Sequence, residues 1–316
     1  MLSRRFAILS TCALIASIPP ASSAQALSLF DQQKYAAFVA DANTGEVLYS
    51  RRADTQRFPA SITKVMTLYM VFEQLAAGQL KLTDRVVMSR NAASQRPSKL
   101  GLKAGGSLTV DQAIRSLATK SANDVSVALA EHIAGSTEEF SRRMTLRARA
   151  LGMSNSRFVN PNGLPDSRQV TTARDIFILS QATIRDFPQY YSYYQQQQFV
   201  FGNMVMPNHN HLLRTMPGVD GIKTGFTNAA GFTLAASAVR DGNRLIAVVL
   251  GGPTRVARDS NVESLLAAGF AVLSARNRGQ NLQVAGLLAE PGDLNDELLR
   301  QLVEQGSGES PSPRPR

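Results

Sequence analysis

Ser61 and Lys64 stand three positions apart at the start of the apolar stretch 65–75. Pro59 and Ser61 are typical of a helix start, and the apolar stretch predicts the buried side of that helix. Residues three apart lie on one helical face, so the two side chains would be neighbours. A lysine amine with a lowered pKa can take the proton of a serine hydroxyl and make it a nucleophile. The pair alone is a weak signal, because a surface lysine near a helix cap gives the same pattern.

Two further short motifs carry groups that such chemistry needs. Residues 121–123, with the sequence Ser-Ala-Asn, form a turn-prone triplet that can present a hydroxyl and an amide to a cleft. Residues 223–225, with the sequence Lys-Thr-Gly, lead into a predicted strand pair, where Gly225 lets a ligand backbone come close. Lys223 adds a second cation. Two ammonium groups in a partly dry cleft repel each other, which lowers the pKa of at least one of them.

The three motifs in this order resemble those of the penicillin-binding proteins and serine β-lactamases. Their surroundings look like the low-molecular-mass D-alanyl-D-alanine carboxypeptidases: Pro-Ala-Ser-Ile-Thr-Lys at 59–64, Ser-Ala-Asn-Asp at 121–124, Val-Asp-Gly-Ile-Lys-Thr-Gly at 219–225 and Gly-Gly at 251–252. The resemblance covers about residues 33–273. It implies the fold shared by serine β-lactamases and transpeptidases.

The resemblance implies a catalytic role for five residues. Ser61 would be the nucleophile that attacks the carbonyl between two D-alanines, and Lys64 would be its general base. Ser121 would relay a proton to the departing D-alanine. Asn123 would bind the donor peptide and steady Lys64, while Lys223 would hold Ser121 and keep the cleft positive.

The same resemblance implies groups that bind the substrate. The backbone N–H groups of Ser61 and Phe226 would form an oxyanion hole. The leaving D-alanine carries a carboxylate. Thr224 and Thr227 would hold it, with Lys223 behind them. Arg258 stands about where the family places a basic residue that reads this carboxylate, although a surface arginine at the start of a helix would look the same.

The chain around these motifs predicts an α/β fold of the α+β kind. Strands are expected at residues 36–40, 46–50, 231–239 and 244–250, and helices at 108–117, 125–132, 138–151, 173–183 and 262–273. Residues 160–165 are loop by composition. This order predicts an antiparallel sheet built from both chain ends, flanked by helices, with a mostly helical subdomain between them.

The two ends of the chain are expected to lie outside the catalytic domain, which we assign to residues 27–275. Residues 1–26 are typical of a signal peptide, with Arg4 and Arg5 before an apolar core and Ala-Gln-Ala at 24–26. We therefore expect export to the periplasm or cell-wall space. Cys12 is the only cysteine, so the mature chain has no disulfide and no cysteine nucleophile.

Residues 276–316 are predicted to be a short, partly disordered tail. Residues 281–288 suggest one strand, and residues 294–303 suggest a short acidic helix, which is unlike a basic membrane anchor. We expect a soluble protein or one loosely associated with a membrane or the cell wall.

The expected function is removal of the terminal D-alanine from peptidoglycan pentapeptide through an acyl-enzyme on Ser61, with β-lactam antibiotics as covalent inhibitors. The alternatives are a D,D-endopeptidase that cuts cross-links and a non-catalytic cell-wall-binding protein. The loop at 160–167 lacks a glutamate to activate a deacylating water, which disfavours a β-lactamase.

The sequence also disfavours nucleic-acid binding, a cofactor and a metal site. The net charge of +10 is scattered, so no nucleic-acid groove is expected. No cofactor is implied. His209 and His211 have no carboxylate or cysteine at ligand spacing, so no metal site is expected.

Overall fold

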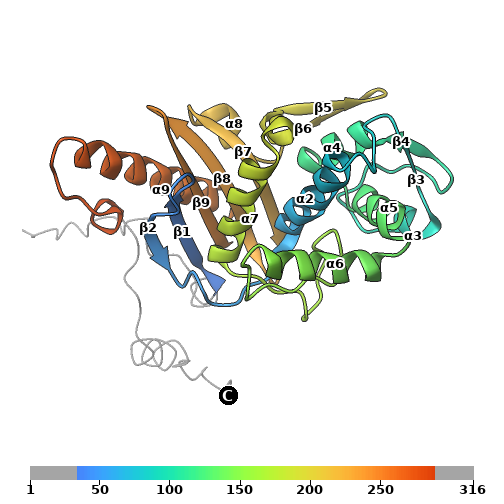
Figure 1. The fold of residues 1–316 in the computed structure, drawn as a ribbon, viewed down its shortest axis with the longest axis horizontal. Coiled ribbons are helices and arrows are strands. Elements are labelled where there is room, and N and C mark those ends of the chain that lie inside the picture. Colours follow the sequence, from blue (N-terminus) through green and yellow to red (C-terminus); the bar gives the residue numbers. More distant parts are fainter. Residues whose placement is uncertain (1–33, 289–316) are drawn as a thin grey trace, which may run out of the picture.

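The computed structural model describes residues 34–288 (Figure 1). The expected signal peptide at 1–26 and the expected acidic helix at 294–303 lie outside the described residues. A five-stranded antiparallel sheet stands beside a group of helices, and both chain ends contribute strands to it. The predicted fold class is therefore confirmed.

The sheet has the strand order β2-β1-β9-β8-β7. Its strands are β1 (Ala36–Asp41), β2 (Val47–Arg51), β7 (Val219–Thr227), β8 (Gly231–Arg240) and β9 (Asn243–Gly252). Successive side chains of a strand point to opposite faces. Accordingly Phe38 and Val248 belong to one hydrophobic cluster and Val39 and Val249 to a second one. The sheet is thus covered on both faces.

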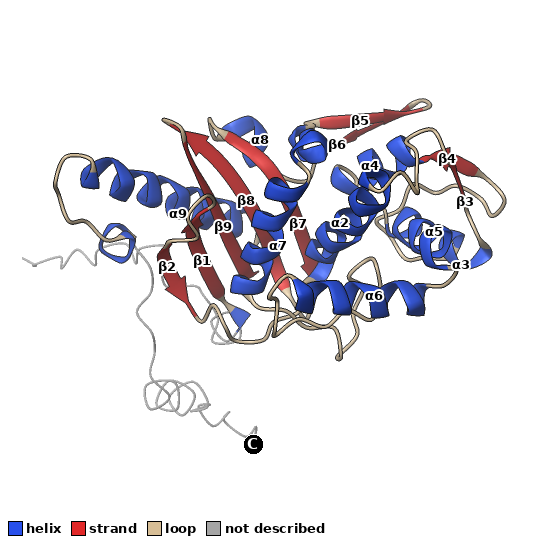
Figure 2. Cartoon of the chain, in the orientation of Figure 1, coloured by secondary structure: helices blue, strands red, loops and turns tan. Residues whose placement is uncertain are grey.

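Helices cover the two faces from different parts of the chain (Figure 2). Helix α9 (Arg255–Arg276) packs on one face through Val262, Leu265 and Leu266. The other face packs against α7 (Ala173–Asp186) and the helical subdomain. That subdomain contains α2 (Thr63–Ala76), α3 (Arg90–Ala93), α4 (Val110–Ala118), α5 (Asn123–Ala134) and α6 (Thr137–Ala150), together with the short strands β3 (Arg85–Val87) and β4 (Ser107–Thr109).

The remaining elements are short. They are the 3-10 turns η2 (Ala60–Ile62), η3 (Pro188–Gln195) and η4 (Val284–Leu287), the hairpin β5 (Gln198–Phe201) and β6 (Met204–Pro207), and helix α8 (Leu212–Thr215). The strand expected at 281–288 is wrong, because the chain forms the turn η4 there.

The strand pair expected near the C-terminal end has a third member, since residues 219–227 are strand β7 rather than a lead-in segment. Gly221 and Gly225 lower the strand propensity of this segment, which is why the pattern concealed it. In the fold both glycines are needed for space. A Cβ on Gly221 would lie 2.5 Å from the Tyr191 hydroxyl, and one on Gly225 would lie 2.8 Å from the Ser61 nitrogen.

Helix α2 is the buried centre of the molecule. Apolar residues surround it on all sides, so it packs as an internal helix rather than an amphipathic surface one. Phe72 on this helix contacts a group of aromatic rings at centroid distances of 5.2 to 6.3 Å, formed by Phe187, Tyr190, Tyr193 and Tyr194. The tyrosines come from η3, so this turn holds α2 in place.

We predict that Phe72→Ala lowers the free energy of unfolding by about 3–5 kcal/mol, because the fully buried ring leaves a cavity among these aromatic side chains. Denaturant unfolding would measure the change. Val256→Ala is the control, since this valine on α9 is 68% exposed and its loss should change stability by less than about 0.5 kcal/mol. Equal losses in the two variants would contradict the central role of α2.

Candidate active site

Ser61 lies in the turn η2, immediately before α2 begins at Thr63. The expected helix start is therefore confirmed, with a 3-10 turn as its first part. Ala60 has a φ of 48°, in the left-handed region that side chains rarely adopt. Gly163 packs so closely on this turn that a Cβ there would overlap the Ala60 carbonyl. The backbone around Ser61 is thus fixed from both sides.

Lys64 points its amine at three oxygen atoms. Its Nζ lies 3.1 Å from Ser61 Oγ and 2.7 Å from Asn123 Oδ1, and it also donates to the backbone carbonyl of Asn162. A neutral amine has two N–H donors and one lone pair. The two carbonyl oxygens can only accept, so they take the N–H groups and leave the lone pair for the Ser61 hydroxyl.

The surroundings of Lys64 favour this neutral form. The side chain is fully buried, and burial lowers its pKa well below the ordinary lysine value. The positive charge of Lys223 lowers this pKa further, while Asp124 opposes the shift. The amine can therefore act as a base at a pH where an exposed lysine would be protonated.

The loop at 160–163 holds the third oxygen in place. Thr67 on α2 and Ser126 on α5 both donate to the carbonyl of Pro161, each at 2.6 Å. The Asn162 side chain donates to Gln95 and accepts from the Leu164 nitrogen. These bonds fix the loop against α2 and α5. The group that faces Lys64 is therefore the backbone carbonyl of Asn162, while the Asn162 side chain only holds the loop in place.

Ser121 and Asn123 lie where α5 begins. Ser121 has a φ of 62°, and its hydroxyl is buried without a hydrogen-bond partner among residues 34–288. Asn123 accepts from Lys64 through Oδ1 and donates through Nδ2 to the Arg96 carbonyl at 2.9 Å. A buried hydroxyl without a partner suits an atom that a ligand will meet.

Lys223 lies on β7, the strand at the edge of the sheet. Its side chain is buried, and burial together with the charge of Arg258 lowers its pKa to about 7. Its amine donates to the Thr224 carbonyl at 3.0 Å. We expected Lys223 to hold Ser121. Within residues 34–288, the Lys223 amine instead bonds to the neighbouring backbone, and Ser121 Oγ has no hydrogen-bond partner.

Arg258 is buried rather than on the surface. It lies in α9 with 2% of its surface exposed, donates to the Thr233 carbonyl at 2.7 Å and pairs with Asp259 at 2.7 Å. Thr233 is the partner of Gly225 in the sheet register, so the guanidinium lies beside the Lys-Thr-Gly segment. Burial lowers the pKa of this guanidinium below its ordinary value.

The remaining predicted binding residues follow along the same strand. Thr224 is buried, Thr227 is partly buried, and the Phe226 ring is half exposed and packs on Phe232 at 4.3 Å. Because β7 has a neighbour on one side only, alternate backbone groups of this strand are unpaired in the sheet. The fold therefore brings Ser61, Lys64 and Asn123 into direct contact, while Lys223 and the binding residues follow along β7 and Arg258 approaches from α9.

Asn162 is the site residue that the motifs did not indicate. It contributes to Lys64 through its backbone carbonyl, which carries no side-chain signature. The turn-rich composition of 160–165 was the only available signal. Within the part of the chain that the structure describes, no three His, Cys, Asp or Glu side chains gather as metal ligands. In that same part, every helix is too short or too polar to cross a bilayer.

A model of the D-alanyl-D-alanine carboxypeptidase family matches residues 22–254. The chain belongs to this family. It is 40% identical over 237 residues to the D-alanyl-D-alanine carboxypeptidase DacA of Escherichia coli, an overlap of 73% of this chain and 59% of that protein. It is 37% identical over 239 residues to DacF of Bacillus subtilis, an overlap of 74% of this chain and 61% of the relative. The chain thus spans less than two thirds of these relatives.

Solved structures agree with this membership. Penicillin binding protein 5 of Haemophilus influenzae superposes with a TM-score of 0.73 at 38% identity, over 75% of this chain and 70% of that one. Penicillin-binding protein D2 of Listeria monocytogenes, solved in an ampicillin-bound form, has a TM-score of 0.66 at 30% identity, over 72% of this chain and 94% of that one.

We predict that the rate at which a neutral active ester acylates Ser61 falls as the pH is lowered through the Lys64 pKa. Protonation removes the lone pair that takes the hydroxyl proton, and burial places this pKa well below the ordinary 10.5. Mass spectrometry of the covalent adduct between about pH 5 and about pH 9 would measure the rate.

Lys64→Arg is the matched variant, because a guanidinium keeps the charge and cannot lose its proton in this range. It should give no adduct at any of these pH values. A wild-type rate that rises as the pH is lowered, or a Lys64→Arg variant that acylates as fast as wild type, would show that Lys64 is not the base.

Proposed function

We propose that this protein is a serine D-alanyl-D-alanine carboxypeptidase that removes the terminal D-alanine from peptidoglycan pentapeptide. The observation that carries the proposal is the buried Lys64 amine, which has two carbonyl acceptors and the Ser61 hydroxyl around it. A binding protein without catalysis has no need for a desolvated base beside a nucleophile. Family membership supplies the substrate class.

The first step forms the acyl-enzyme. Lys64 takes the Ser61 proton while Oγ attacks the carbonyl between the two D-alanines. The negative charge that develops on the carbonyl oxygen is stabilised by the backbone N–H groups of Ser61 and Phe226. The close approach of Gly225 to the Ser61 nitrogen supports this assignment, since it brings β7 and η2 together.

The second step expels D-alanine. The C–N bond breaks as the leaving nitrogen receives a proton from the Ser121 hydroxyl. The protonated Lys64 amine then gives its proton to Ser121, so the hydroxyl is restored. Asn123 holds the amine during this exchange and binds the peptide. A water molecule then attacks the ester with its proton passing to Lys64, which releases the shortened peptide and restores the Ser61 hydroxyl.

The carboxylate of the leaving D-alanine needs a positive partner. Lys223 in the middle of β7 and Arg258 beside the same strand supply charge, and the hydroxyls of Thr224 and Thr227 supply hydrogen bonds. A carboxylate also stabilises the charged form of Lys223, whose pKa of about 7 lies in the range where this matters. The cleft is therefore suited to a free C-terminus.

We propose that β-lactam antibiotics inhibit the protein by forming the same kind of covalent adduct with Ser61. The ampicillin-bound form of the Listeria relative supports this, and the loop at 160–167 has no glutamate to speed hydrolysis of the adduct. The reaction would take place in the periplasm or cell-wall space, with residues 27–275 as the catalytic domain and at most a loose association with membrane or cell wall. No nucleic acid or cofactor takes part in it.

We predict that mature protein releases D-alanine from a disaccharide pentapeptide, and that Ser61→Ala lowers the rate at least about a thousandfold, because the nucleophile is lost. Mass spectrometry would follow free D-alanine, with a cross-linked dimer as the second substrate. Cleavage of the dimer without free D-alanine would make the protein an endopeptidase. If neither substrate is cleaved and penicillin forms no adduct at Ser61, a cell-wall-binding role without catalysis is what remains.

We further predict that Arg258→Ala lowers kcat/KM for the peptide at least about thirtyfold, mainly through KM, because a buried partner of the carboxylate is lost. Acylation by a neutral ester should change far less, and it also reports that the variant is folded. Equal effects on the two substrates would exclude a role in reading the carboxylate.

A further inference from the structure

The chain between residues 85 and 110 carries cations and no carboxylate. Its cationic residues are all exposed: Arg85, Arg90, Arg96, Lys99 and Lys103. Arg85 bonds to Ser107 at 2.6 Å. The side chains of the other four form no hydrogen bond or ion pair within residues 34–288. These four residues, Arg90, Arg96, Lys99 and Lys103, are called the basic strip below.

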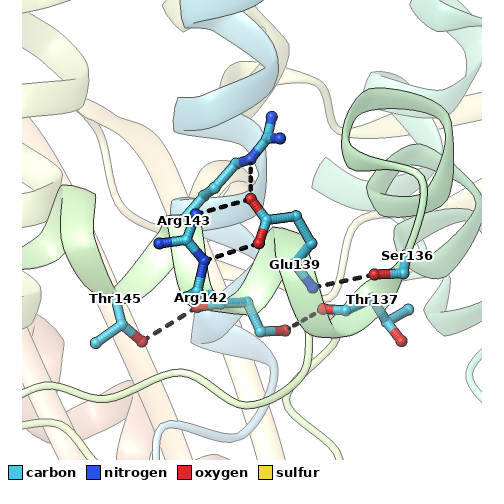
Figure 3. A network of polar contacts seen from close by, with 7 residues as sticks. Ser136, Thr137, Glu139, Arg142, Arg143 and Thr145 are labelled. Atoms are coloured by element: carbon cyan, nitrogen blue, oxygen red, sulfur yellow. Dashed lines mark hydrogen bonds and ion pairs between the residues drawn. The ribbon is translucent and has the colours of Figure 1, made fainter.

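Arginines in other parts of the protein lie beside carboxylates. Ten arginines of residues 34–288 form an ion pair with an aspartate or a glutamate, and none of them belongs to the basic strip. On α6, for example, Glu139 accepts from both Arg142 and Arg143 at 2.7 to 2.9 Å (Figure 3). A neighbouring carboxylate cancels much of the positive potential of an arginine. The basic strip has no such neighbour, so it attracts anions from solution.

The loop that carries most of the basic strip is held by the active site. The Arg96 carbonyl accepts from Asn123 Nδ2 at 2.9 Å, and the Ser98 carbonyl accepts from the Asn123 nitrogen at 2.7 Å. The buried carboxylate of Asp124 accepts from the backbone nitrogens at positions 100 and 101, at 2.9 and 2.8 Å. The backbone of this loop is thus fixed against catalytic residues, while its cationic side chains are exposed beside them.

The surface around the basic strip has charge without exposed apolar groups. No large apolar side chain is exposed between residues 88 and 107, and Leu100 in the middle of the loop is buried. A surface that enters a bilayer needs apolar side chains among its cations. The strip is therefore better suited to carboxylates on a water-soluble polymer, and its place beside the active site suits a polymer that also carries the substrate peptide.

We propose that the basic strip binds free carboxylates on the peptide stems next to the one in the active site, so that the protein prefers polymeric glycan strands to isolated peptides. Each stem of an uncross-linked strand carries carboxylates, and the strand repeats them. Cations beside the active site hold the strand while one terminal D-alanine reaches Ser61, which raises the local concentration of substrate. This inference rests on the proposed function.

Four substrates test the preference. They are a single disaccharide pentapeptide and a strand of several such repeats, each made with D-isoglutamate or with the neutral D-isoglutamine in the stem. In low salt, we expect kcat/KM per stem to be at least about fivefold higher for the isoglutamate strand than for the single unit. This excess should disappear in about 0.5 M NaCl, because salt screens exposed charges. No excess, or an equal one for the isoglutamine strand, would overturn the proposal.

Two triple variants locate the preference. The test variant removes three charges of the basic strip: Arg90→Gln, Lys99→Gln and Lys103→Gln. The control removes three exposed arginine charges on α6, on β8 and after α9: Arg149→Gln, Arg240→Gln and Arg278→Gln.

The test variant should lower kcat/KM for the isoglutamate strand at least about fivefold and change the value for the single pentapeptide less than about twofold. The control loses the same net charge and should keep the preference for the strand. An equal loss in the two variants would show that the strand responds to net charge, which would contradict a role for the basic strip.

Binding to Ser61→Ala separates the basic strip from the chemistry. Calorimetry should show tighter binding of the isoglutamate strand than of the isoglutamine strand, and the three strip substitutions should abolish this difference. Absence of the difference, while wild type releases D-alanine, would refute the strip proposal alone. A clear difference without D-alanine release from any substrate would support the strip and refute the proposed function.

Cosedimentation with phosphatidylglycerol vesicles tests the other source of negative charge. We expect the test variant and wild type to bind the vesicles equally weakly. Strong vesicle binding that only the test variant loses, without a preference for the isoglutamate strand, would assign the basic strip to lipid and overturn the proposal.

Discussion

The desolvation of one ammonium group is the constraint on which this structure depends. Lys64 lies on α2, a helix that is buried along most of its length, and the cost of removing its charge from water exceeds the stabilisation that the surrounding carbonyl groups give. The fold therefore has to be stable enough to bury a group that favours water. The internal helix α2, held by the aromatic side chains of η3 and by the sheet, provides that stability.

The neighbours of Lys64 then determine what its neutral amine can do. Two carbonyl oxygens orient the N–H groups, and the remaining partner within residues 34–288 is a hydroxyl on a turn whose backbone is fixed by close packing. Ala60 and Ser121 both have a positive φ, and each lies within two residues of a side chain that contacts Lys64. Backbone strain is thus found at the site as well as at Arg52 and Asp241, and at the site it is supported by close packing.

The sequence predicted the parts of this arrangement that depend on side chains in a fixed pattern. The motif residues, the strands at both chain ends and the long helices were recovered because hydrophobic periodicity and residue type carry that information. Strand β7 was concealed by its glycines, and no helical or strand periodicity marked η3, whose Tyr191, Tyr193 and Tyr194 are buried. The carbonyl of Asn162 could not be predicted, since any residue offers the same backbone atom.

The position of β7 at the edge of the sheet has a consequence for what can reach Ser61. An unpaired strand edge is a template on which another sheet can grow, and proteins usually blunt such edges. Here η2, η3 and α8 all contact β7, so other parts of the same chain take up some of the space around this strand. A single extended chain end needs far less width than a folded partner. The neighbours of β7 thus leave less of its edge open to a second sheet than a bare edge strand would offer.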